Sequence, residues 1–254
     1  MSDPPAGLQP ITVACGRVLP SPGPVPDPLP ILHLDDELVV VSKPAGLLVH
    51  KTATGADEEA LLQRLRDQLA RPVFPVQRLD RWTSGAIAYG LSSHAAGRLQ
   101  AALKRPEAVK EYLALVHGDV AAPFESRTPL VDDHEVERDA WSEFRPRESF
   151  LRARLTLVVA RLHTGRYHQV RRHLALAGHP VCGDPYYGKP HLNRWLATRH
   201  GLTRLFLHAS RLVIPRPHGE PLAFEAPLAA DLGAVLASLV RNGAGLGGRP
   251  GPPG

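Results

Sequence analysis

The chain has few cysteines and no long apolar run, and these absences exclude several classes of protein. Its 254 residues include two cysteines, Cys15 and Cys182, which lie far apart and form no CxxC pair or Cys/His metal pattern. Neither a disulfide framework nor a zinc site is therefore indicated. No run of eighteen apolar residues occurs, and prolines interrupt the N-terminal region, where a signal peptide needs a continuous apolar core. We expect no membrane insertion and no secretion, but a reduced, cytoplasmic protein.

Proline and glycine are concentrated at the two ends of the chain. Residues 1–30 contain nine prolines, and residues 243–254 are almost entirely glycine and proline. Such segments contribute little to a packed core, so we expect a flexible N-terminal segment over 1–30 and a disordered tail over 243–254. The 43% hydrophobic content is sufficient for one folded domain over residues 31–242.

The hydrophobic pattern predicts more strands than helices. Residues 38–42 are apolar and β-branched, residues 151–157 alternate between apolar and polar, and a further strand should include residues 205–209. Three helices are predicted: residues 57–70 with Thr54 as candidate cap, a helix through Leu103 capped by Ser92, and one containing Val170 and Leu174 that Gly178 ends. Because strands and helices do not alternate regularly, an α+β fold with a largely antiparallel sheet is favoured.

Charge is distributed unevenly along the chain. Residues 150–220 hold twelve Lys/Arg against two acidic residues, whereas residues 121–150 hold eight acidic residues against four arginines. The basic region could hold a phosphate backbone, although basic regions also occur on proteins that bind no nucleic acid. The acidic segment is more simply a solvated insertion.

The most informative segment is residues 78–85, RLDRWTSG, in which Asp80 lies between Arg78 and Arg81. The flanking guanidinium groups stabilise the carboxylate form and supply charge for an anionic substrate, which makes Asp80 a candidate nucleophile. An exposed aspartate between arginines is also typical of a solvated ion pair of little energetic importance. The segment alone does not separate these two interpretations.

Five further segments occur with it in a characteristic order: residues 39–50 (VVVSKPAGLLVH), 110–116 (KEYLALV), 164–174 (TGRYHQVRRHL), 178–188 (GHPVCGDPYYG) and 207–210 (LHAS). Together, over residues 30 to 230, these segments resemble the RluA-type pseudouridine synthases. The resemblance implies a long, bent, mostly antiparallel mixed β-sheet with flanking helices and a central catalytic cleft, so that residues 31–242 would be the catalytic domain. It also implies the isomerisation of a uridine in structured RNA to pseudouridine, with no cofactor and no metal.

The resemblance assigns roles to particular residues. Asp80 is expected to be the catalytic carboxylate, either attacking the sugar at C1′ or acting in a glycal route. Arg171 would pair with it, and Tyr112 would pack against the target base and do acid/base work. Arg78 would occupy the space left by the flipped uridine. The remaining RNA contacts are expected at Arg81, Lys110, Arg166, His168 and Arg172, and the loop supports at Thr83, Ser84 and Gly85.

The chain departs from the family pattern at two points, and its histidines do not have the spacing of metal ligands. Gln77 stands where the family usually has histidine, and the N-terminal segment is too short for the RNA-binding module that many relatives carry, so the catalytic domain alone must hold the RNA. The isolated histidines lack metal-ligand spacing, so we expect no metal site. We also expect a monomer.

The substrate is predicted from short stretches. Residues 90–93 and 201–210 resemble the branch that modifies the acceptor arm of tRNA more than the branches that modify large-subunit rRNA, which remain the alternative. Two other classes stay open: a non-catalytic RNA-binding protein, and a nucleoside hydrolase or glycosylase that uses Asp80 but releases free uracil. No second carboxylate stands where it could activate water, which disfavours the hydrolase.

Overall fold

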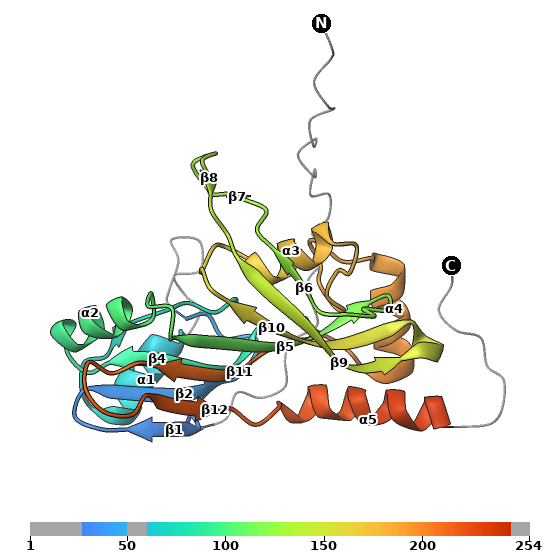
Figure 1. Cartoon of the computed structure of the whole chain (residues 1–254). Coiled ribbons are helices and arrows are strands. Elements are labelled where there is room, and N and C mark those ends of the chain that lie inside the picture. Colours follow the sequence, from blue (N-terminus) through green and yellow to red (C-terminus); the bar gives the residue numbers. More distant parts are fainter. Residues whose placement is uncertain (1–26, 50–59, 245–254) are drawn as a thin grey trace, which may run out of the picture.

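The computed structural model describes residues 27–49 and 60–244, which form one mixed sheet with helices on both faces (Figure 1). Cys15, the candidate cap Thr54 and the tail beyond residue 244 lie outside the described residues. Leu29, assigned above to the flexible segment, is 2% exposed, and its backbone N–H donates to Oε1 of Gln68. The packed fold therefore reaches back beyond residue 31, the predicted boundary.

The sheet has ten strands, and a separate two-stranded hairpin projects from it (Figure 1). The strands of the sheet are β1 (Ile31–Leu34), β2 (Leu38–Lys43), β3 (Phe74–Pro75), β4 (Ser84–Gly90), β5 (Val109–His117), β6 (Phe124–Ser126), β9 (Ser142–Phe150), β10 (Leu155–Leu162), β11 (Leu207–Ile214) and β12 (Leu222–Glu225). The hairpin consists of β7 (Leu130–Val131) and β8 (Glu137–Arg138). The helices are α1 (Leu61–Leu69), α2 (Ser93–Ala102), α3 (Gln169–Leu176), α4 (Pro190–His200) and α5 (Ala230–Ala244), with a 3₁₀ turn η1 (Leu151–Ala153).

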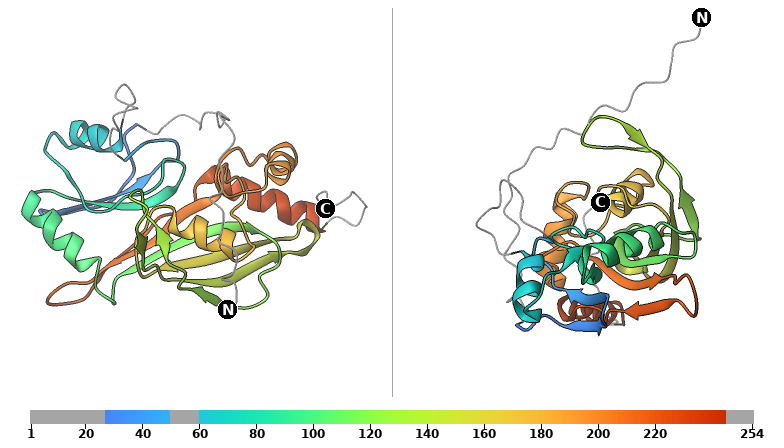
Figure 2. Two further views of the ribbon diagram at one scale, coloured as in Figure 1. Left: turned by 90° about the horizontal axis from the view of Figure 1, so that it is seen from above. Right: turned by 90° about the vertical axis from the view of Figure 1, so that its left-hand side faces the viewer.

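The main path of the sheet runs β1-β2-β4-β11-β5-β10-β9-β6, with β3 paired to β4 and β12 to β11. Among the described strands, β4 and β11 pair in parallel, whereas the other pairs are antiparallel. The predicted α+β class with a mostly antiparallel sheet is confirmed. Seen from above, β1, β2, α1 and α2 form one end of the molecule, and α4 and α5 lie at the other (Figure 2).

The core lies on both faces of the sheet because side chains alternate along each strand. On β5, Tyr112 and Ala114 face α3 and pack with its Leu174, while Leu113 on the opposite face packs with Leu232 of α5. Figure 1 shows α3 and α5 on opposite sides of the sheet. The segment containing Asp80 lies on the α3 side, since neighbouring side chains in it pack against the same cluster.

The three predicted helices are present. In α1, Leu61 and Leu65 are buried, although the predicted first turn at residues 57–59 lies outside the described residues. Ser92 caps α2, because its side chain accepts a hydrogen bond from the Ala95 N–H at 3.1 Å. Gly178 follows α3 with φ of 83°, a conformation that glycine adopts without strain.

Part of one strand prediction is wrong. Residues 151–154 alternate in polarity but form η1 and a left-handed residue, Arg154 (φ 51°), and β10 begins only at Leu155. The reason is that β9 and β10 pair antiparallel, with Leu155 opposite Phe150, so the chain must reverse between them. Leu151 is consequently 70% exposed. The strand expected over residues 205–209 begins two residues later, at Leu207, and α4 and α5 had not been predicted.

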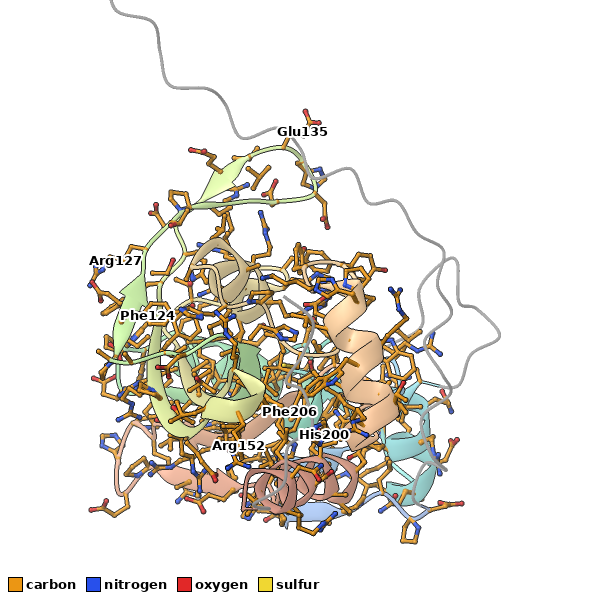
Figure 3. All side chains as sticks on the ribbon, turned by 90° about the vertical axis from the view of Figure 1, so that its right-hand side faces the viewer. Phe124, Arg127, Glu135, Arg152, His200 and Phe206 are labelled. Carbon is orange, nitrogen blue, oxygen red and sulfur yellow. The ribbon has the colours of Figure 1, made fainter. Side chains whose placement is uncertain are left out.

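The acidic segment forms the edge of the molecule. Figure 3 shows Phe124 on β6, Arg127 just after this strand and Glu135 at the outer end of the β7–β8 hairpin, whereas Phe206 lies in the interior. Asp132 organises the hairpin turn by accepting the N–H groups of His134 and Val136. Most of this hairpin is exposed, as expected of a solvated insertion.

Candidate active site

Asp80 lies in the loop that immediately precedes β4, where the two halves of the sheet join. At this joint Gly85 of β4 pairs with Ala209 of β11. Gly85 has φ of 111°, and a Cβ atom there would lie 2.2 Å from the Ala209 carbonyl oxygen. Only glycine permits this approach of the two strands, which explains the glycine that ends the RLDRWTSG segment.

Two buried basic side chains, Lys43 and Arg204, hold the backbone that follows Asp80. The Lys43 ammonium, 1% exposed, donates to the carbonyls of Arg81 and Thr83, each at 2.9 Å. Nη1 of Arg204 donates to the carbonyl between them, that of Trp82, at 3.3 Å. Burial lowers the pKa of Lys43 to about 7, while the nearby charge of Asp80 opposes this effect. Sequence reasoning gave Lys43 and Arg204 no role, because bonds from side chains to backbone carry no sequence signal.

The three predicted loop supports are all buried. Ser84 is tied to distant elements: its Oγ lies 2.9 Å from Nδ1 of His208 and accepts from Nη2 of Arg204. Arg204 in turn forms a bidentate pair with Asp231 of α5, at 2.6 and 2.9 Å. The Thr83 N–H donates to the Asp80 carbonyl, but the Thr83 hydroxyl has no hydrogen-bond partner within the described residues.

Arg171, on the first turn of α3, connects two carboxylates. Its Nη1 donates to Oδ2 of Asp80 at 2.9 Å, and its Nε and Nη2 donate to Asp184 at 2.7 and 2.9 Å. The Arg171 side chain is 4% exposed, that of Asp184 is fully buried and that of Asp80 is 24% exposed. Burial acts to lower the pKa of Arg171, but the hydrogen bonds and charges of Asp184 and then Asp80 raise it overall. Asp184 fixes the guanidinium, and Asp80 presents its carboxylate at the surface.

Asp184 had been quoted in the GHPVCGDPYYG segment without a role. It also accepts the backbone N–H groups of Tyr186 and Tyr187, at 2.8 and 3.1 Å. Both rings lie near the Arg171 guanidinium, whose Cζ is 5.5 Å from the centroid of Tyr186 and 5.2 Å from that of Tyr187. The segment therefore forms an aromatic wall beside the Asp80–Arg171 pair.

Tyr112 and His168 complete the surroundings of Asp80. Burial and then the charge of Asp80 raise the pKa of Tyr112, so its phenol is neutral at neutral pH. His168 caps α3 in a left-handed conformation, and its Nε2 is 3.8 Å from Oδ2 of Asp80. Burial lowers the pKa of His168 to about 4, although Asp80 acts to raise it, so this imidazole is also neutral near pH 7.

Three other predicted RNA contacts, Arg78, Arg81 and Lys110, differ in how far hydrogen bonds within the protein already hold their side chains. Arg78 is exposed and makes no hydrogen bond or ion pair within the described residues. Nε of Arg81 donates to the Gly46 carbonyl at 2.8 Å, and the Gly46 N–H returns a bond to the Arg81 carbonyl. Lys110 reaches the carbonyl of Leu103 at 3.4 Å. Of these three cations, Arg78 is the freest to meet a substrate.

Arg166 and Arg172 hold the hairpin segment against α3. Nε of Arg166 donates to the Asp139 carbonyl at 2.8 Å, and Nη1 of Arg172 donates to the Val131 carbonyl at 2.9 Å. These bonds position the β7–β8 hairpin beside the candidate site. The hydrogen-bonding capacity of each guanidinium is only partly used by them.

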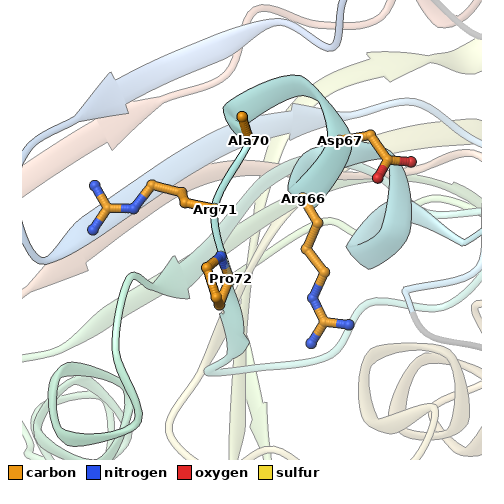
Figure 4. A pocket seen from close by; sticks show the side chains of 5 residues that line it. All are labelled: Arg66, Asp67, Ala70, Arg71 and Pro72. Atoms are coloured by element: carbon orange, nitrogen blue, oxygen red, sulfur yellow. The ribbon is translucent and has the colours of Figure 1, made fainter.

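A surface hollow of about 700 Å³ lies at the end of α1 and contains none of these residues (Figure 4). It is lined by Arg66, Asp67, Ala70, Arg71 and Pro72. Residues 27–49 and 60–244 contain no cluster of three His, Cys, Asp or Glu side chains suited to a metal ion. No helix in the same ranges is long and apolar enough to cross a membrane.

A partly exposed carboxylate fixed by a buried arginine, with neutral tyrosine and histidine side chains around it, is a site suited to acid/base or nucleophilic chemistry. Comparison with known proteins identifies the class. A sequence profile described as RNA pseudouridylate synthase matches residues 37–176. The chain belongs to this family and is therefore an isomerase that converts uridine in RNA to pseudouridine.

Individual relatives agree with this assignment. The chain is 37% identical over 210 residues to a tRNA pseudouridine synthase C of Pasteurella multocida, covering 74% of this chain and 86% of the relative. It is 37% identical over 222 residues to the protein of the same name from Salmonella typhi, covering 79% and 85%. Among solved structures, human RNA Pseudouridylate Synthase Domain Containing 4 superimposes with a TM-score of 0.68 at 25% identity, over 83% of this chain and 93% of the human chain. The predicted family and fold are confirmed.

Proposed function

We propose that Asp80 is the catalytic carboxylate of a tRNA pseudouridine synthase, acting on a uridine of the acceptor arm. The observation that carries the proposal is the contact of Asp80 with Arg171, which Asp184 holds in place from the other side. The Arg171 donor, 2.9 Å from Oδ2, orients the Asp80 carboxyl group that both the C1′-attack route and the glycal route use.

The surrounding side chains supply the remaining steps. Tyr112, neutral and buried beside Asp80, packs against the displaced base and can exchange a proton with it. The uridine must leave its stack to reach Asp80, and Arg78 on the same loop, exposed and without an ion pair among the described residues, fills the vacated position. Arg81, Arg166, His168 and Arg172 contact the RNA around the site. Lys110 is assigned the same role, although its ammonium is directed to the Leu103 carbonyl.

The choice of tRNA is supported by the relatives, which are named for tRNA and are matched over most of their length. The catalytic domain, proposed as residues 31–242 together with the packed Leu29, is proposed to act as a monomer without a cofactor or metal. A cytoplasmic location follows from a tRNA substrate. Large-subunit rRNA is the alternative substrate that the experiment must exclude.

The test uses purified protein without added metal or nucleotide cofactor, incubated with tRNA and separately with large-subunit rRNA, both from a strain that lacks the gene. Pseudouridine is mapped by carbodiimide modification and primer extension. We expect one new site in tRNA, absent with Asp80→Asn although this variant binds tRNA as tightly as the wild type. Turnover retained by Asp80→Asn would remove Asp80 from its role, and a new site in rRNA alone would overturn the substrate assignment. Free uracil would identify a hydrolase, and tight binding without any product would identify a non-catalytic RNA-binding protein.

A further inference from the structure

Tyr167 presents an exposed aromatic ring beside the candidate site, and no role has yet been given to it. The residue is 52% exposed and belongs to the loop that leads into α3, directly before His168. Isolated exposed apolar side chains are ordinary on a protein surface and need no explanation. The arrangement of this ring relative to Asp80 distinguishes it from them.

The rings of Tyr167 and His168 are stacked, with centroids 3.7 Å apart and planes inclined by 23°. His168 is fixed in turn, since its Nδ1 lies 3.2 Å from the hydroxyl oxygen of Tyr187 and its Nε2 lies 3.8 Å from Oδ2 of Asp80. One face of the Tyr167 ring is thus covered by a positioned imidazole. Within the described part of the chain no second aromatic ring or guanidinium packs on Tyr167, which is 52% exposed, so His168 lies between this exposed ring and Asp80 in the chain of contacts.

The left-handed backbone of His168 supports a functional interpretation of this stack. His168 has φ of 53° and ψ of 27°, a conformation that non-glycine residues adopt at an energetic cost. Although His168 is the N-cap residue of α3, its side chain makes no cap bond, so side-chain capping does not account for the imidazole. The conformation directs the imidazole between Asp80 and Tyr167.

Charge and spacing both suit a nucleobase on the exposed ring of Tyr167. Burial, and then the charge of Asp80, raises the pKa of Tyr167, so the phenol is neutral at neutral pH, and His168 is neutral as well. A base stacked on Tyr167 would lie about 3.4 Å beyond its ring, the ordinary spacing of stacked nucleotides. The rings of Tyr167 and His168 would then separate this base from Asp80. The position therefore suits the nucleotide next to the target uridine and not the target uridine itself.

We propose that Tyr167 is a stacking platform for the nucleobase adjacent to the target uridine. This inference rests on the proposed function, because it assumes that a uridine is bound at Asp80. Aromatic side chains bind unpaired bases in this way without reading their identity, so the platform holds an unstacked neighbour and does not select its sequence. It predicts that the RNA is opened at more than one nucleotide.

The test is a double-mutant cycle between Tyr167 and the RNA. Binding is measured by fluorescence anisotropy with Asp80→Asn protein and the tRNA identified above, carrying an abasic nucleotide on the 5′ or the 3′ side of the target uridine in separate molecules. Tyr167→Leu removes the ring, Tyr167→Phe keeps it, and Leu151→Ala removes an exposed apolar side chain far from Asp80 in the sequence. Thermal unfolding of each variant checks that it is folded.

We expect Tyr167→Leu to weaken binding of intact tRNA by about 5- to 100-fold, with Tyr167→Phe and Leu151→Ala close to the starting protein. On one of the two abasic RNAs the Tyr167→Leu effect should disappear, because the partner base is already absent. Equal effects of Tyr167→Leu on intact RNA and on both abasic RNAs would overturn the platform, as would loss of binding by Tyr167→Phe. If Asp80→Asn forms no pseudouridine but the effects of Tyr167→Leu and of the abasic nucleotides on binding simply add, only the platform is wrong. If Asp80→Asn still forms pseudouridine, the proposed function fails whatever the binding measurements give.

Discussion

Asp80 and Asp184 share Arg171, and we expect changes at Asp184 to affect stability and changes at Asp80, the proposed catalytic carboxylate, to affect turnover. Changing Asp184 to Asn replaces one of its carboxylate oxygens with an amide NH₂ group. That group would face an Arg171 N–H or a backbone N–H of the next turn, since the carboxylate accepts four such bonds. A donor would then meet a donor in a site from which solvent is excluded, and a buried guanidinium would lose its main counter-charge.

The magnitudes differ between the two positions because their exposures differ. Removing one partner of a buried ion pair costs about 3–5 kcal/mol, so Asp184→Asn should lower the free energy of unfolding by that amount. Asp80 is 24% exposed at its side chain and takes a single bond from Arg171, which keeps Asp184 when Asp80 is changed. Asp80→Asn should therefore cost about 1 kcal/mol or less, as for solvated pairs.

Thermal and urea unfolding followed by circular dichroism would measure both changes. For a domain of this size about 1 kcal/mol corresponds to about 2–4 °C in Tm, so we expect Asp184→Asn to unfold about 6–20 °C below the wild type and Asp80→Asn to stay within about 4 °C. Turnover should be abolished in Asp80→Asn at temperatures where it is folded. The reasoning is refuted if the two variants lose equal stability, or if Asp80→Asn is the less stable one.

Three further predictions concern the strand joint, acid stability and base flipping. Gly85→Ala should give insoluble protein or a Tm lowered by more than about 10 °C, because its Cβ would meet the Ala209 carbonyl at 2.2 Å. The control Gly97→Ala, which meets nothing within 4 Å in α2, should gain about 0.5–1 kcal/mol; equal Tm values would contradict this contrast. Burial lowers the pKa of His117 to about 4 from 6.5, so the unfolded state binds the proton first and stability is lost as pH falls from 6.5 to about 4, on the order of 3 kcal/mol. His117→Gln should flatten this part of the stability profile in urea titrations, and an unchanged profile would assign the acid sensitivity elsewhere. Arg78→Ala should reduce turnover more on intact tRNA than on a short flexible fragment with the same uridine, whereas equal losses would discredit its wedge role.

Much of the local structure could be predicted because its causes are local. The Ser92 cap and the glycine after α3 depend on residues within one helical turn, and both were predicted correctly. The alternation in residues 151–157 was misleading because the same polarity pattern fits a strand or an exposed reversal, and only the pairing of Leu155 with Phe150 decides where β10 begins. The apolar side chains of α4 and α5, two helices that were not predicted, pack with one another and with the sheet.

The sequence by itself determined which side chains could form the site, since Asp80, Tyr112 and Arg171 stand in ordered segments, and it determined the family. The tertiary structure decided how those side chains are held. The parallel pairing of β4 with β11 brings Ser84 beside His208, which lies 124 residues further along the chain, and places Lys43 and Arg204 under the backbone that follows Asp80. It also stacks Tyr167 on a histidine that contacts Asp80. These contacts depend on strand order and on burial, which arise from packing across the whole sheet and leave no periodicity in any single segment.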